Sequence, residues 1–100
     1  MAAVVFTPTA AADLARLIRT HSLPDSTRER VKRSLAALGR FPRLGAQLAG
    51  RWSAFRFVLG PWRWMIVVYA YDESADRVSI VTIQDARTAS AATTESRDQV

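Results

Sequence analysis

Apolar residues recur with two different spacings along this chain, and the spacing predicts where helices and strands lie. Residues 4–6 (VVF) are β-branched or aromatic and predict a short first strand. Thr7 and Pro8 follow and predict a helix start, because threonine caps helices and proline suits the first helical position. The apolar positions of this first helix have helical spacing: Leu14, Leu17 and Ile18.

A second helix is predicted after the break at residues 21–24 (HSLP). Residues 26–29 (STRE) fit a capping box, in which a hydroxyl and a glutamate three positions later satisfy each other's backbone N–H groups. Gly39 stands where a C-cap glycine is expected. The apolar stripe of this helix is Val31, Leu35 and Leu38. Two amphipathic helices with a short break between them predict an antiparallel helical hairpin.

Three strand-like segments follow an irregular stretch at residues 41–50. Residues 55–59 alternate, with Arg56 opposite the apolar face, and Gly60-Pro61 turns the chain. Residues 63–71 are apolar on both faces, which predicts a central strand. Residues 78–83 form the last strand after a polar turn at 72–76. Strands joined by short turns pair antiparallel.

The predicted fold class is therefore α+β, in the order β-α-α-β-β-β, with the helical hairpin packed on one face of a small antiparallel sheet. Residues 1–87 are expected to form this domain, and the small, polar residues 88–100 either a frayed tail or a short helix that is ordered only by a partner. The predicted core consists of Phe6, Leu14, Leu17, Ile18, Val31, Leu35, Leu38, Ile66, Val68, Ile80 and Ile83.

Charge is unevenly distributed over the 100 residues, whose formal net charge is +5. Residues 1–71 carry +8 and residues 72–100 carry −3, and every basic residue except Lys32 is an arginine. A basic body predicts an anionic partner such as nucleic acid or an acidic protein. A plain solvated surface explains the same charge, and charge alone leaves both explanations open.

Several functional classes are disfavoured by composition. The chain has no cysteine, which excludes disulfide scaffolds and thiolate chemistry, and its single histidine, His21, makes a metal site improbable. No glycine-rich phosphate loop is present, so we expect neither a metal nor another cofactor. The longest apolar run, residues 64–71, is too short to span a membrane, and no signal peptide opens the chain. We expect a soluble, cytoplasmic protein.

The sequence resembles the RelE/ParE superfamily of bacterial type II toxin–antitoxin toxins over residues 4–87. The resemblance includes the opening residues 5–8 (VFTP) and the helical hairpin. Residues 41–45 (FPRLG), with Leu48 and Gly50, are similar to the family connector NPRLGxxLxG, with Phe41 in place of asparagine. Residues 55–57 (FRF), the turn at Gly60 and Arg63 are similar to the family's R-V-G-x-Y-R hairpin.

This resemblance implies two different activities. RelE-like members enter the ribosomal A site and cut mRNA, whereas ParE-like members poison DNA gyrase by protein contact. In both, a small antitoxin wraps the toxin in a hetero-oligomer. The fold alone does not choose between these activities. We expect a metal-independent endoribonuclease that acts on ribosome-bound mRNA. The alternative is gyrase inhibition, and a third possibility is a non-toxic relic that only binds an antitoxin.

The expected catalytic residues are Arg63, Arg56 and Arg87, on or beside the sheet where the resemblance places basic active-site residues. Guanidinium groups match phosphate oxygens, and Arg56 and Arg63 are expected to face each other across one turn. Ordinary solvent-facing arginines are the competing explanation. Asp85 stands near the end of the last strand, where nuclease members carry His, Tyr or Lys. It is a candidate base if buried, or else it pairs with an arginine or caps a local turn. The family's frequent tyrosine is Ile66 here.

Tryptophans 52, 62 and 64 lie among arginines in a short window. Such residues stack on bases or anchor a partner helix. Trp64 alternates with buried positions and is expected in the core, which leaves Trp62 and Arg51 as the candidate RNA-binding residues. His21 is interpreted as a helix-end histidine stabilised by the helix dipole.

Overall fold

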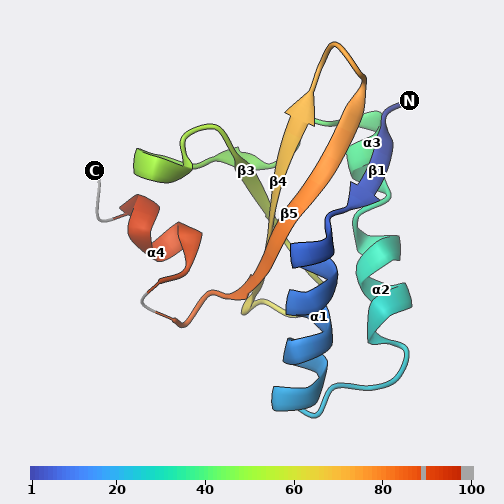
Figure 1. Cartoon of the computed structure of the whole chain (residues 1–100), viewed down its shortest axis with the longest axis vertical. Coiled ribbons are helices and arrows are strands. Elements are labelled where there is room, and N and C mark those ends of the chain that lie inside the picture. Colours follow the sequence, from blue (N-terminus) through green and yellow to red (C-terminus); the bar gives the residue numbers. More distant parts are fainter. Residues whose placement is uncertain (89, 98–100) are drawn as a thin grey trace.

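The computed structural model describes residues 1–88 and 90–97, and it confirms the α+β class (Figure 1). The strands are β1 (Ala3–Phe6), β2 (Ala46–Gln47), β3 (Arg56–Leu59), β4 (Met65–Asp72) and β5 (Arg77–Asp85). The helices are α1 (Pro8–Thr20), α2 (Thr27–Ser34), α3 (Ala37–Arg40) and α4 (Ala92–Arg97), with a 3-10 turn, η1, at Gly50–Trp52. Within the described residues, no helix is long and apolar enough to cross a membrane.

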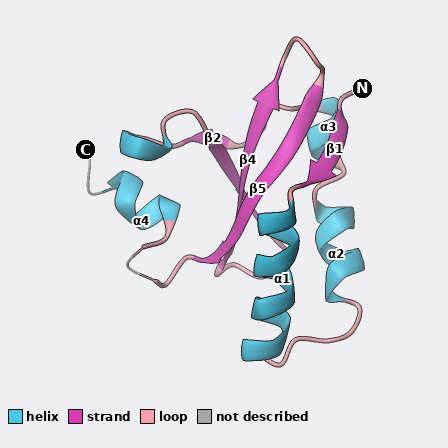
Figure 2. Cartoon of the chain, viewed as in Figure 1, coloured by secondary structure: helices cyan, strands magenta, loops and turns pink. Residues whose placement is uncertain are grey.

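One five-stranded sheet in the order β1-β5-β4-β3-β2 forms the centre of the molecule (Figure 2). β4 is its middle strand, and residues 65–69 are buried, as their apolar character on both faces predicts. β2, β3, β4 and β5 pair antiparallel. β1 pairs parallel with β5, so the sheet is mixed rather than wholly antiparallel. The long connection through the helices allows this direction, since a tight turn is not required.

Two hydrophobic clusters lie on opposite faces of the sheet. The larger cluster joins α1, α2 and α3 to β4 and β5, and it includes Val31, Leu35, Leu38 and Ile80. Nine of the eleven predicted core residues are buried, while Phe6 and Ile18 are partly exposed. The smaller cluster contains Leu48, Val68 and Ala92 and packs against partly buried aromatic residues.

Thr7 begins α1 as predicted, and Ser26 is the N-cap of α2 as predicted, but the expected capping box and the C-cap at Gly39 are not found. The Thr7 hydroxyl accepts from the Ala10 N–H (3.2 Å). Ser26 makes no side-chain cap, because its φ of −76° and ψ of 1° are not the extended values that a capping hydroxyl needs. Gly39 is not a C-cap either. It lies inside α3, where its carbonyl accepts from the Ala2 N–H (2.8 Å).

The C-terminal segment contains a short helix, α4, which contacts the rest of the chain. α4 packs on the sheet face opposite α1 and α2, with Ala91 and Ala92 almost fully buried. The Gln84 side chain accepts from the Ala92 N–H (2.8 Å), and Arg51 pairs with Glu95. Residues 90–97 are therefore ordered by the chain's own body rather than only by a partner. The rest of the expected tail, residues 89 and 98–100, lies outside the described residues.

Candidate functional site

The C-terminal ends of α1 and β5 meet at one end of the sheet, where four polar side chains are linked by hydrogen bonds. His21 is the C-cap of α1, and its Nε2 lies 3.0 Å from Oδ2 of Asp85, the last residue of β5. Arg87 holds the same carboxylate through Nε (2.9 Å) and Nη2 (2.7 Å). The Thr20 hydroxyl lies 2.9 Å from the other ring nitrogen of His21. The imidazole is thus fixed from both sides.

Trp64 lies in the middle of this end of the sheet. Its ring stacks on His21, with 4.5 Å between centroids and 12° between planes. The Arg87 guanidinium lies 5.2 Å from the Trp64 ring centroid. Trp62 is 6.3 Å from Trp64, and the Arg30 guanidinium of α2 lies 4.8 Å from the Trp62 ring. Trp64 is consequently half-buried rather than a core residue.

Asp85 is unsuited to the role of general base. Its hydrogen bonds from Arg87 hold the pKa of the carboxyl far below its usual range, with a smaller contribution from His21. A base must bind a proton near the working pH, and a carboxylate stabilised in this way does not. The arginine-partner role, the other possibility raised by the sequence, describes Asp85 correctly.

The expectation that Arg56 and Arg63 face each other is wrong. Arg56 lies opposite Tyr69 in the β3–β4 register, and Leu59, three residues further along β3, lies opposite Ile66. At ~3.3 Å per residue, Arg56 is about 10 Å from the hairpin end of the strand. The Arg56 side chain is half-buried and donates to the Gly45 carbonyl (2.8 Å).

Arg63 and Arg87 do lie at the same end of the sheet. The Ala86 N–H donates to the Trp64 carbonyl (2.7 Å), which continues the β4–β5 pairing beyond Met65. Arg63 is exposed in the β3–β4 connection and precedes β4 rather than opening it. Trp62 lies in the same connection, half-buried beneath Arg30.

Arg51 lies in a different environment, on η1 beside α4. It pairs with Glu95 (2.6 Å) and its guanidinium lies 5.3 Å from the Trp52 ring. This hydrogen bond lowers the pKa of Glu95. The structure therefore brings together Arg63, Arg87, Asp85 and Trp62, and it places Arg56 and Arg51 elsewhere.

Two members of this cluster were missed from sequence, His21 and Arg30. His21 was interpreted only as a helix-end residue, and Arg30 as one of several basic residues on α2. Figure 1 shows that α1 and β5 run in the same direction, so their C-terminal ends lie together. The sequence did not predict the parallel pairing of β1 with β5 that precedes this arrangement. Nothing in the spacing of Arg30 distinguishes it from its neighbours, since its contact with Trp62 arises only after folding.

Removing the Asp85 charge is expected to change the pH dependence of stability. A carboxyl whose folded-state pKa is lowered stabilises the fold above its unfolded pKa of about 3.9 and loses that contribution as pH falls toward the folded value. Asp85→Asn should therefore lower the free energy of unfolding at pH 7 by about 1–3 kcal/mol. Its stability should also fall less steeply than that of the wild type below pH 4.

Chemical denaturation between pH 2 and pH 7 measures this effect. Asp25→Asn is the matched control, because Asp25 is exposed and forms no ion pair within the described part of the chain. Parallel stability curves for wild type and Asp85→Asn would show that the Asp85–Arg87 pair contributes nothing.

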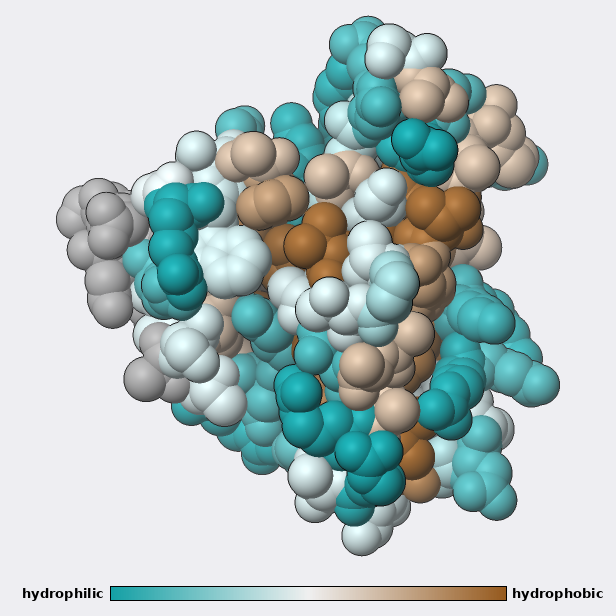
Figure 3. All heavy atoms as spheres, viewed as in Figure 1, coloured by the Kyte–Doolittle hydropathy of each residue, from teal (hydrophilic) through white to brown (hydrophobic). Residues whose placement is uncertain are grey.

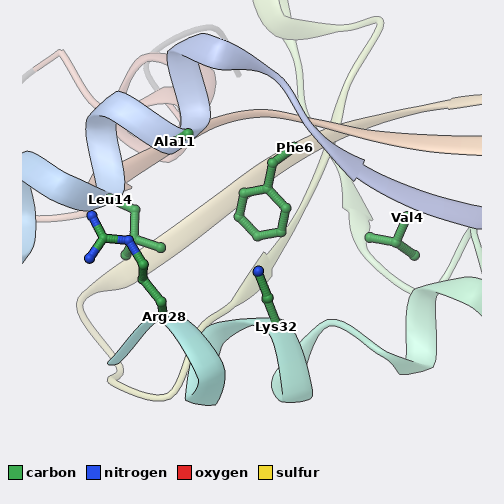
Figure 4. Close-up of a pocket in the computed structure, with 6 residues that line it drawn as sticks. All are labelled: Val4, Phe6, Ala11, Leu14, Arg28 and Lys32. Carbon is green, nitrogen blue, oxygen red and sulfur yellow. The ribbon is translucent and has the colours of Figure 1, made fainter. Parts of the chain in front are cut away.

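A groove lies between the first strand and the two long helices, away from the tryptophans. Figure 3 shows apolar surface between the hydrophilic side chains that cover α1 and α2. The groove holds about 370 Å³, and in Figure 4 the Phe6 ring points into it while Arg28 and Lys32 extend from α2 at its edge. Its lining residues are Val4, Phe6, Ala11, Leu14, Arg28 and Lys32. Neither Arg28 nor Lys32 forms an ion pair within residues 1–88 and 90–97.

No cluster suited to a metal ion is found in the part of the chain that the structure describes. Within it, no three His, Cys, Asp or Glu side chains come together. Asp85 is the carboxylate that the described residues place beside Trp64, and its oxygens are already bound by Arg87 and His21. The arrangement can hold anions through guanidinium groups, and it presents aromatic surface beside them.

Comparisons with known proteins agree with this fold. The toxin chain of the RelBE2 toxin–antitoxin complex from Mycobacterium tuberculosis is 23% identical, with a TM-score of 0.62 over 84% of this chain and 90% of that chain. The chromosomal ParDE system from P. aeruginosa gives 14% identity and a TM-score of 0.64, covering 85% and 96%. The intact E. coli RelBE complex gives 16% and 0.63, covering 88% and 100%. No curated protein matches the sequence.

The family assignment comes from the sequence profile of the ParE toxin of the type II toxin–antitoxin system parDE, which matches residues 4–89. The matched segment runs from β1 through the end of β5, so it includes the sheet, the two long helices and the cluster around Trp64. The chain belongs to the ParE family of type II toxin–antitoxin toxins.

Proposed function

We propose that this protein is a ParE-type toxin that arrests bacterial growth by binding DNA gyrase in the cytoplasm, and that a small antitoxin neutralises it. One observation carries the choice of gyrase over RNA cleavage. Of the four residues expected to perform phosphate chemistry, only Arg63 is free of a partner within the described residues. A toxin that acts by binding another protein does not need Arg56, Arg87 and Asp85 to meet at one phosphate group.

RNA cleavage needs a base for the 2′-hydroxyl, charge stabilisation at the phosphate and an acid for the leaving oxygen. Asp85 stays ionised beside Arg87, and Arg56 is committed to the Gly45 carbonyl. These facts disfavour the nuclease that the sequence led us to expect. Ribosome-dependent mRNA cleavage remains the second candidate because His21, an imidazole, lies beside Arg87 and Asp85.

The antitoxin is the partner proposed for the groove between α1 and α2. Phe6 and Leu14 offer apolar surface there, and Arg28 and Lys32 offer charges that form no ion pair within the described part of the chain. A segment with alternating apolar and acidic side chains would satisfy both features. The RelBE2, ParDE and RelBE neighbours are toxin–antitoxin systems or complexes, which supports a hetero-oligomer here.

Purified toxin tests the proposal against both candidate targets. With bacterial gyrase, ATP and relaxed plasmid, the toxin is expected to block supercoiling and to leave linear DNA when the reaction is stopped with detergent. In a bacterial translation extract, primer extension of a reporter mRNA is expected to show no cuts at A-site codons. Intact gyrase activity together with A-site cuts would reject gyrase in favour of mRNA cleavage, and inactivity in both assays would identify a non-toxic relic.

A further inference from the structure

Four aromatic and basic side chains from three parts of the chain contact one another in a row, and the exposed Arg63 lies between the two tryptophans in the sequence. We name this group the tryptophan–arginine surface; its members are Arg30, Trp62, Arg63, Trp64 and Arg87. We propose that the toxin binds its target through this surface, and that the target contacts the surface through carboxylate groups. This inference rests on the proposed function and specifies the chemistry of the contact.

The two tryptophan rings of the surface are held by contacts within the chain. Trp64 is held between His21 and Arg87, and His21 is itself fixed by Thr20 and Asp85. Trp62 lies between Trp64 and Arg30. Ordering a mobile side chain on binding costs about 0.5–1.5 kcal/mol, and a surface that is already ordered avoids most of that cost. Tryptophan and arginine are also the side chains most enriched among energetically dominant interface residues.

Asp85 neutralises Arg87, but the other two arginines of this surface have no ion-pair partner within the described residues. Arg30 and Arg63 are exposed and form no ion pair or side-chain hydrogen bond within the described residues. Asp85 is the one carboxylate bound in the cluster, and Arg87 and His21 occupy its oxygens. Two guanidinium groups are therefore available, and the Arg30 guanidinium lies over the Trp62 ring, 4.8 Å from its centroid. A stacked guanidinium binds carboxylates in a bidentate manner.

The arrangement of the rings favours an acidic protein over single-stranded RNA. Proteins that bind single strands use open aromatic faces on which bases stack. Here one neighbour of Trp64 is His21 and another is Arg87, and Trp62 is covered by Arg30. A base would have to displace one of these groups, whereas a carboxylate needs only the outward-facing donors.

Charge reversal tests the inference in the gyrase assay. Arg63→Glu and Arg30→Glu are each expected to raise the toxin concentration for half-inhibition of supercoiling at least tenfold. Arg40→Glu is the control, because Arg40 is exposed on α3, at the opposite end of the sheet, and makes the same change in net charge. It is expected to stay within twofold of the wild type. Circular dichroism melting confirms that each variant is folded.

The outcomes separate this inference from the function on which it rests. Wild-type inhibition that survives both Arg63→Glu and Arg30→Glu would overturn the surface and leave gyrase inhibition standing. A wild type without effect on gyrase would overturn both. Binding of a labelled oligouridine probe that is lost in Arg63→Glu, with no gyrase effect, would assign the surface to RNA instead. If Arg40→Glu loses as much inhibition as Arg63→Glu, net charge alone explains the effect, and a defined contact surface is contradicted.

Discussion

Asp13→Ala is expected to lower the free energy of unfolding by about 2–4 kcal/mol, a large share of the roughly 5–15 kcal/mol typical of a small domain. The Asp13 carboxylate on α1 is almost fully buried. It accepts from the Thr82 hydroxyl and from the Ile83 N–H (3.3 Å), both in β5, and from Arg16 (3.1 Å). Alanine would leave two buried donors of β5 unpaired, and each costs about 1–3 kcal/mol.

Sheet topology explains why this carboxylate is needed. β1 pairs with β5 only as far as Phe6 and Ile80, so the next residues of β5 have no strand on that side. Asp13 supplies the missing acceptor from the helix that covers this edge. Urea denaturation monitored by circular dichroism measures the loss, with the exposed Asp25→Ala as control. Equal free energies of unfolding for the two variants would show that Asp13 does not stabilise β5.

Gly45→Ala is the second substitution with a large expected effect, about 2–4 kcal/mol. A Cβ at Gly45 would lie 2.5 Å from the Phe57 carbonyl oxygen and 2.8 Å from the Tyr69 ring and hydroxyl. Backbone on one side and a fully buried ring on the other leave no room to move. The shift would also break the bond from the Gly45 N–H to the Tyr69 hydroxyl (2.8 Å) and the Arg56 bond to the Gly45 carbonyl.

Gly39→Ala is the matched control, because a Cβ there meets the Ala2 carbonyl at 3.2 Å and the flexible Met1 side chain at 3.3 Å. We expect its free energy of unfolding to change by less than about 1 kcal/mol, since alanine is also the better helix former. Thermal melts of both variants measure the difference. A Gly45→Ala protein that melts with the wild type would contradict the tight packing around Tyr69.

Periodicity predicted the elements that bury a continuous apolar face, and it failed where burial is small or indirect. β4, β5 and the apolar stripe that runs from α2 into α3 follow directly from their apolar positions. A helix at α4 was only one of two alternatives because Ala91 and Ala92 are small, and their burial depends on aromatic residues of the η1 region beneath them. No spacing within residues 88–100 carries that information.

The candidate site was predicted less well, because it depends on register. Gly60-Pro61 indicated a tight turn, but the chain does not re-enter the sheet until Met65. The Gly60 N–H bonds to the Met65 carbonyl and closes a longer loop. Those extra residues place Arg63 beyond the strand and away from Arg56. The length of a hairpin loop sets the register between its two strands. A loop longer than expected therefore separates side chains that sequence spacing would place opposite each other.

The FPRLG connector shows what a motif supplies and what it omits. The sequence marked Gly45 as part of a family pattern without a physical reason. The reason is steric and polar, since Tyr69 and Arg56 both bond to the Gly45 backbone. Burial raises the pKa of Tyr69, so its hydroxyl remains a neutral acceptor for the Gly45 N–H. Arg56, expected to bind phosphate, is thus part of the support for this loop.

Pulse labelling of cells after induced expression of the toxin tests the central claim most directly. Incorporation of a labelled amino acid is followed beside a reporter of the DNA-damage response, with the Arg63→Glu protein expressed in parallel. The account predicts that the damage response rises within minutes while protein synthesis continues, and that Arg63→Glu weakens the response. Collapse of protein synthesis before any damage signal, with mRNA cut in the A site, would contradict it.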